Sequence, residues 1–140
     1  SRFAIEQFVL NTDNDIFSTR QLRLMIDWHT APEKNTTIGS IDLYDFDPQN
    51  KRAGIGILID EPFRRHGFAL ESLKLLVDYC FNTLNLHQVY CTIEESNTES
   101  IKLFTKAGFT GCGIRREWLY RGGNWINELA FQLINTEYKQ

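Results

Sequence analysis

The chain has 140 residues, of which 42% are hydrophobic and 24% charged, and its formal net charge is −3 at pH 7. These values predict one globular domain. The sequence contains no apolar run long enough to span a membrane. It also lacks the basic and aromatic stripe that would indicate a nucleic-acid partner. The three cysteines lack C-x-x-C spacing, which indicates buried thiols. The three histidines are scattered along the chain and predict no metal site. The start of the chain does not resemble a signal peptide, so we expect a cytoplasmic protein.

The first half of the chain predicts one short helix and three strands. The spacing of Phe3, Ile5, Phe8 and Val9 predicts a helix over residues 2–10. A polar loop is expected over 11–18. Three β-branched, apolar runs predict strands over residues 20–28, 37–44 and 52–60. Turns are expected between them, at residues 32–37 and 45–51.

The second half predicts a helix on each side of a strand, then a hairpin. A long amphipathic helix follows residues 64–69 and ends near Asn85. The strand over 88–94 must return beside the strand 52–60, which makes a β-α-β crossover. Ser96-x-x-Glu99 predicts a capping box for a helix that stops at Gly108. The hairpin comprises residues 113–121 and 124–135.

The most informative stretch is Arg64-Arg65-His66-Gly67-Phe68-Ala69, which joins a predicted core strand to the long helix. The first N–H groups of a helix and its positive dipole end favour anions. Gly67 permits close approach to the backbone, and two arginines add contacts suited to phosphate. A solvated connection is the alternative interpretation. Neither a P-loop nor a dinucleotide fingerprint fits the spacing.

Charge is distributed unevenly along the chain. Residues 1–50 hold four Lys or Arg against eight Asp or Glu, a balance of −4, whereas residues 51–140 balance at +1. A solvated acidic surface explains this asymmetry. The less favoured alternative is an acidic face that attracts a cationic substrate.

The order of elements and two motifs resemble the GNAT superfamily of acetyl-CoA-dependent N-acetyltransferases over about residues 20–135. Residues 64–69 match the Q/R-x-x-G-x-G/A pyrophosphate motif of that superfamily. The second motif is Asn97-x-x-Ser100-x-x-Leu103-Phe104-x-x-x-Gly108-Phe109. The runs 78–90 and 117–125 resemble the bacterial spermidine/spermine (diamine) N-acetyltransferases in particular.

The resemblance implies a single α/β domain over residues 1–140 with the acyl-CoA N-acyltransferase fold. That fold has a mixed, mostly antiparallel sheet with a central parallel crossover and splayed strands. It implies acetyl-CoA as co-substrate, without a metal. The cofactor-binding residues it implies are Ile57, Leu58 and Ile59 for pantetheine, Arg64, Arg65, His66, Gly67, Phe68 and Ala69 for the pyrophosphate, and Asn97, Ser100 and Phe104.

Three departures from the family pattern stand out. The N-terminal strand and first helix of the fold are expected to be missing before Ser1. Phe104 stands where these enzymes carry a tyrosine that protonates the departing thiolate. The polyamine enzymes carry carboxylates around the strand 52–60, and one of those positions is Gly54, with Asp45 near another. Gly54 and Gly56 either admit the cofactor or relieve packing against Trp118 or Trp125.

The amine must lose a proton before it attacks the thioester, because an alkylammonium has a pKa of about 10.4. Candidate bases are Asp45, Glu94 and Asp42, and His29 is a weaker candidate. The alternative interpretation of each of the three acids is a solvated surface carboxylate without a catalytic role. For Asn97 and Ser96 the alternative interpretation is that they only cap the helix that follows them.

The sequence thus predicts a cytoplasmic N-acetyltransferase acting on a small amine, of the polyamine or diamine type. The alternatives are a protein N-terminal or aminoglycoside acetyltransferase, a weakly catalytic CoA-binding regulatory domain, and an interaction domain that binds no CoA. The oligomeric state, a homo-oligomer included, stays open.

Overall fold

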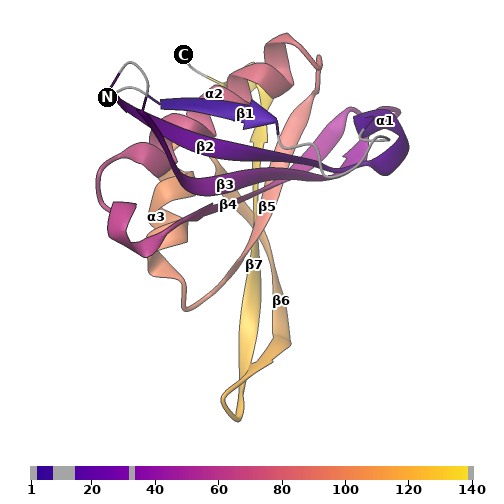
Figure 1. Cartoon of the computed structure of the whole chain (residues 1–140). Helices are drawn as coiled ribbons and strands as arrows, with labels where there is room; N and C mark the ends of the chain where they lie inside the picture. The colour runs from indigo at the N-terminus through magenta and orange to yellow at the C-terminus, as the bar shows by residue number, and fades with distance from the viewer. Residues whose placement is uncertain (1–2, 8–14, 32–33, 139–140) are drawn as a thin grey trace.

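The computed structural model describes residues 3–7, 15–31 and 34–138. Within these residues seven strands form one sheet in the order β1-β2-β3-β4-β5-β7-β6 (Figure 1). The central β4–β5 pair is parallel, and the other neighbouring strands are antiparallel. The strands are β1 (Phe3–Gln7), β2 (Leu22–Ala31), β3 (Lys34–Asp47), β4 (Arg52–Ile59), β5 (Gln88–Glu94), β6 (Thr110–Arg121) and β7 (Asn124–Ile134).

Two helices, α2 (Phe68–Asn82) and α3 (Thr98–Lys106), pack on one face of this sheet and enclose the core. Shorter helical turns are α1 (Ile16–Thr19), η1 (Glu61–Phe63) and η2 (Asn135–Glu137). Strand side chains alternate between the core and the opposite side, which we call the open face. The core positions of the central strands include Ile41, Leu43, Ala53, Ile55, Val89, Cys91 and Ile93.

The central part of the predicted topology is confirmed. β5 has the expected bounds, and it runs parallel to β4 after the α2 crossover. The C-terminal hairpin forms around Gly122 and Gly123, and it projects well beyond the rest of the sheet (Figure 1). No helix in the described part of the chain is long and apolar enough to cross a membrane.

The predicted helix over residues 2–10 is wrong. Phe3–Gln7 is instead the strand β1, which pairs in register with β2 from Phe3–Trp28 to Gln7–Leu24. Pairing with an existing strand outweighs a helical spacing carried by so few residues. The part of that prediction over 8–10 lies outside the described residues.

The polar loop expected over 11–18 contains part of a helix. Residues 11–14 lie outside the described residues, and α1 begins directly after Asp15. The Asp15 carboxylate accepts a hydrogen bond of 3.0 Å from the Phe17 N–H and thereby caps the helix.

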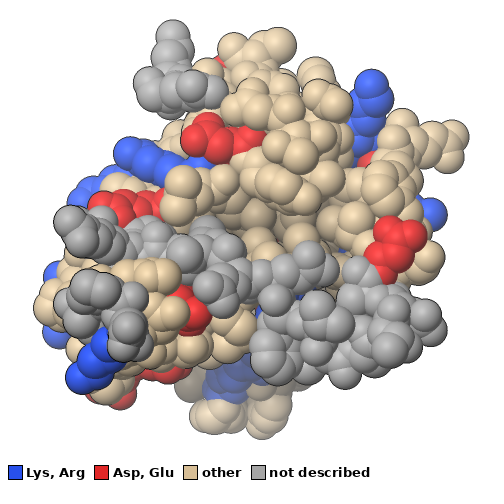
Figure 2. Space-filling model, turned by 45° about the horizontal axis from the view of Figure 1, so that its top comes forward, with Lys and Arg blue, Asp and Glu red and all other residues tan. Residues whose placement is uncertain are grey.

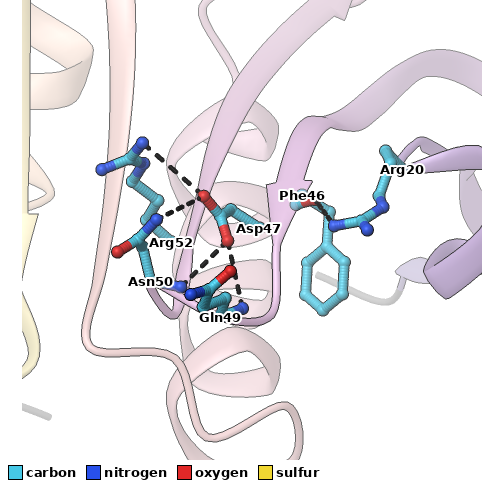
Figure 3. Close-up of polar contacts among 6 residues, drawn as sticks. All are labelled: Arg20, Phe46, Asp47, Gln49, Asn50 and Arg52. Carbon is cyan, nitrogen blue, oxygen red and sulfur yellow. Dashed lines mark hydrogen bonds and ion pairs between the residues drawn. The ribbon is translucent and has the colours of Figure 1, made fainter.

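Asp47 organises the turn between β3 and β4. Its carboxylate accepts hydrogen bonds from the N–H groups of Gln49 (3.0 Å) and Asn50 (2.9 Å), and Arg52 lies 3.6 Å away (Figure 3). These bonds, above all those from Asn50, lower the pKa of Asp47. The predicted hairpin turn forms, but it is shorter than the expected 45–51, because β3 continues to Asp47 before β4 begins at Arg52.

Charge on the surface is mixed. Figure 2 shows acidic and basic side chains interspersed among uncharged ones on the face drawn there. Two carboxylates of the acidic N-terminal half are paired with arginines, because Arg23 lies 2.9 Å from Asp42 and Arg52 lies near Asp47.

Candidate functional site

β4 and β5 separate in the middle of the sheet. Their ladder consists of Arg52–Gln88, Ala53–Val89 and Gly54–Tyr90, and it ends at this last rung. β4 stays paired with β3 as far as Ile59, and β5 stays paired with β7 as far as Glu94. Figure 1 shows the two strands running apart from this point. Over Ile55–Ile59, therefore, the β5-facing edge of β4 lacks a strand partner among the described residues.

The predicted anion loop lies at the far end of this splay. β4 ends at Ile59, five residues beyond the last rung, which is about 16 Å at the rise of a strand. Gly67 caps α2 with a φ of 80° and no side-chain hydrogen bond. A Cβ at Gly67 would meet nothing within 4 Å, so the space over this helix start is open. A ligand can approach the first N–H groups of α2 there.

The loop is held at both ends. Arg64 donates a 2.8 Å hydrogen bond from Nε to the carbonyl of Ile59, which fixes the loop to the end of β4. Phe68 is 4% exposed, and its ring lies 5.0 Å from that of Trp28. Because its side chain is buried, Phe68 does not present its ring to a ligand. His66 stacks on the same ring at 5.6 Å and stays exposed.

The second motif lies beside this loop, because Arg65 of the loop is 3.5 Å from Glu99 in the first turn of α3. Asn97, and not Ser96, is the N-cap of α3, so the predicted capping box is wrong in its first residue. The Asn97 side chain accepts a 3.2 Å hydrogen bond from the Ser100 N–H. Capping is thus one role of Asn97, while contact with a cofactor stays a prediction for both residues.

Phe104 lies inside the core. Its side chain is 3% exposed, and its ring meets that of Phe109 edge to face at 5.0 Å. This packing fixes the end of α3 against the segment that enters β6. A structural role explains the phenyl ring fully, and a role next to the cofactor sulfur stays a prediction.

The candidate bases differ in what already binds them. Asp42 accepts two hydrogen bonds from Arg23, and Glu94 lies 2.9 Å from Arg121 of β6. An arginine that donates to a carboxylate competes with any amine for it. Asp45 is exposed, has a φ of 48° and pairs with no cation of the described residues.

His29 has a buried Nε2 atom without a hydrogen-bond partner in the described part of the chain. Among the described residues, no three or more His, Cys, Asp or Glu side chains lie together in a group that could hold a metal ion.

Sequence reasoning missed an aromatic pair on the open face. The Tyr44 ring lies over Gly54, where an added Cβ would be 2.2 Å from its Cε2 atom. Tyr44 and Tyr90 meet edge to face at 6.1 Å. Gly54 therefore makes room for Tyr44, and not for Trp118 or Trp125. A Gly-x-Gly spacing on a strand is the one signal that could have suggested a ring lying across it.

Comparison with known proteins identifies the family. A family model described as an acetyltransferase (GNAT) domain matches residues 4–110. The chain is 34% identical over 106 residues to the uncharacterized N-acetyltransferase p20 of Bacillus licheniformis, covering 76% of this chain and 60% of that one. It is 26% identical over 100 residues to the spermidine N(1)-acetyltransferase of Escherichia coli K12, covering 71% and 54%. The chain thus spans little more than half the length of these relatives.

The fold is also that of solved acetyltransferases. Spermidine N-acetyltransferase from Vibrio cholerae, solved in complex with CoA and spermine, superposes with a TM-score of 0.80 at 22% identity. The match covers 88% of this chain and 70% of that one. On the evidence of its splayed β4–β5 pair, its sequence and its fold, the chain belongs to the GNAT acetyltransferase family.

Proposed function

We propose that this chain transfers the acetyl group of acetyl-CoA to a primary amine of a small cationic acceptor, by direct attack in a ternary complex. One observation supports this most: the β4–β5 ladder ends at Gly54–Tyr90, and a glycine-capped, basic helix start lies at the far end of the resulting splay.

The residues of the splay fit acetyl-CoA. A diphosphate suits the open start of α2 at Gly67, where Arg65 adds an exposed cation. The pantetheine amides would pair with the free edge of β4 at Ile57, Leu58 and Ile59, in the manner of an added strand. The thioester end then lies toward the last rung of the ladder.

In the proposed reaction the amine nitrogen bonds to the thioester carbonyl carbon, and the carbon–sulfur bond breaks to release the CoA thiolate. The amine gives up a proton, and the thiolate takes one. Asp45 and Glu94 are the proposed proton acceptors, and Asp45 is the better placed because, within the described part of the chain, it forms no ion pair with an arginine, whereas Glu94 does. A thiolate is a tolerable leaving group, since thiols have a pKa of about 8.5, so turnover does not require an acid at Phe104.

The acceptors of similar proteins support a primary alkylammonium as the acceptor class. Spermidine is the acceptor named for the Escherichia coli relative, and spermine is bound in the Vibrio cholerae structure. We extend to this chain only the shared chemistry, a primary alkylammonium. The excess of acidic residues in positions 1–50 favours such a cation.

Calorimetric titration with CoA tests the binding half of the proposal. CoA at a hundred-fold excess over Kd should stabilise the folded state by about 2.7 kcal/mol. Gly67→Val should abolish this gain. Gly123→Val is the matched control, because Gly123 has a φ of 83° and equally open surroundings but lies in the β6–β7 turn. Both variants carry similar backbone strain of about 1–3 kcal/mol. Equal CoA affinity in both variants would place the site elsewhere.

A thiol-release assay with an amine panel tests the catalytic half. The panel should include diamines, polyamines, an aminoglycoside and a peptide with a free N-terminus. The lack of a hydroxyl at Phe104 favours one second candidate, a CoA-binding domain with little catalysis. CoA binding without thiol release on any amine would support that candidate.

A further inference from the structure

The residues that close the β4–β5 ladder form an aromatic surface on the open face. Tyr44 of β3 is the register partner of Gly54, and its ring extends over β4. An ideal Cβ on Gly54 would lie 2.2, 2.4 and 2.7 Å from three atoms of that ring, and one on Gly56 would lie 4.0 Å away. The ring therefore takes the space that a side chain at position 54 would need.

Tyr90 stands on the other side of the last rung. It pairs with Gly54 across the parallel ladder, and its ring meets that of Tyr44 edge to face. Both rings are only partly buried. The two tyrosines thus mark the place where β4 and β5 separate, the end of the splay opposite the loop at Gly67.

The surroundings of this pair are anionic. Asp45 acts electrostatically on both Tyr44 and Tyr90, while the other nearby acid, Asp47, is offset by Arg52. Burial raises the pKa of Tyr44 to about 12, so its phenol stays neutral at physiological pH. An electron-rich aromatic pair attracts a cation more than a neutral group, especially beside a carboxylate that pairs with no cation of the described residues.

We infer that Tyr44 and Tyr90, together with the Asp45 carboxylate, bind the alkylammonium acceptor beside the thioester, and that Tyr44 determines acceptor specificity. This inference rests on the proposed function. Because the Tyr44 ring excludes any side chain from position 54, the acceptor is recognised there by aromatic rings and not by a carboxylate on β4.

The test compares two acceptors of equal length: n-butylamine, which is a cation at pH 7, and an alkoxyamine, which is uncharged. CoA affinity and turnover of the unmodified chain are measured first. Tyr44→Leu, which keeps bulk but removes the ring, should raise KM for butylamine by about 2- to 30-fold, the factor that a cation–π contact supplies. KM for the alkoxyamine and the Kd of CoA should change little. Tyr44→Phe should retain the low KM.

Tyr79→Leu is the matched control, because Tyr79 is an exposed tyrosine of α2. The inference would be overturned if Tyr44→Leu raised KM equally for both acceptors, or left KM for butylamine unchanged. The proposed function would still stand in that case, provided that the unmodified chain binds CoA and turns over. Absence of CoA binding in the unmodified chain would overturn both.

A second measurement does not depend on the folding of a variant. In the unmodified chain labelled with ¹³C at its five tyrosines, butylammonium added to the CoA complex should shift the ring signals of Tyr44 and Tyr90. The signals of Tyr79, Tyr120 and Tyr138 should stay in place. Shifts confined to those three would overturn the inference.

Discussion

Arg65 and Glu99 connect the two motifs of the proposed CoA site. The Arg65 guanidinium lies 3.5 Å from the Glu99 carboxylate, and these side chains are 88% and 69% exposed. A pair this exposed contributes little to stability. It does matter for a ligand, because a diphosphate at the start of α2 must compete with Glu99 for the same guanidinium.

Glu99→Gln should therefore strengthen CoA binding. We expect up to a fivefold lower Kd at low salt, from the roughly 0.2–1 kcal/mol of an exposed pair. The difference should vanish near 1 M salt, where charges are screened within about 3 Å. Stability should fall by up to about 1 kcal/mol, because Glu99 also complements the dipole of α3. Calorimetry at the two salt concentrations, with the remote Glu137→Gln as control, decides; weaker binding would contradict the role of Arg65.

Gly54 and Gly56 offer a matched pair of substitutions. Gly54→Ala places a methyl group 2.2 Å from the Tyr44 ring, whereas Gly56→Ala places one at 4.0 Å. We expect Gly54→Ala to destabilise the chain by about 1–3 kcal/mol through overpacking, and Gly56→Ala to stay within about 0.5 kcal/mol. Urea denaturation measures both. Tyr44→Ala should remove most of the cost of Gly54→Ala in a double-mutant cycle, and additive effects would contradict the observed contact.

The sequence predicted the parts of the fold that depend on local pattern. Val89, Cys91 and Ile93 alternate with polar residues, so the bounds of β5 followed from the sequence. Gly67 could be placed at the start of α2 because a glycine precedes an amphipathic run. The splay itself came from the family resemblance, since nothing local in β4 shows where its pairing with β5 ends.

Features set by distant pairing could not be predicted in this way. β1 is a strand because β2 pairs with it, a relation invisible within Phe3–Gln7. The place of Tyr44 over Gly54 depends on the β3–β4 register, and that register shifts between Tyr44 and Asp47. The arginine partners of Asp42 and Glu94 come from other strands for the same reason.

Phe104→Tyr separates a core role from a catalytic one. Since the ring is 3% exposed against Phe109, an added hydroxyl is expected to lose its water without gaining a partner. We expect a loss of about 1–3 kcal/mol in unfolding free energy and an unchanged kcat. The urea midpoint and kcat are measured on the same variant, with Phe17→Tyr at an exposed ring as control. An increase in kcat, at most the roughly 10²- to 10⁴-fold of acid catalysis, would place the ring at the CoA sulfur instead.

Alkaline pH should weaken the fold through its buried thiols. Burial raises the pKa of Cys80 from 9.0 to about 12, and Cys91 shifts likewise, first through burial and then through Cys112. The folded chain holds these protons after the unfolded chain has lost them. Their contribution to stability is therefore complete below pH 9 and is lost as pH rises toward 12.

The expected slope above pH 9 is at most about 1.4 kcal/mol per pH unit for each thiol. Cys80→Ala should remove one such contribution, at the cost of a small cavity that lowers stability equally at every pH. Cys112→Ala is the comparison: this thiol is exposed and contributes only the smaller part of the Cys91 shift, so the variant should change the slope less than Cys80→Ala does. Urea midpoints between pH 7 and 11 measure the slopes. If Cys80→Ala shifts the curve without making it shallower, Cys80 ionises equally in both states and its burial does not govern the alkaline limit.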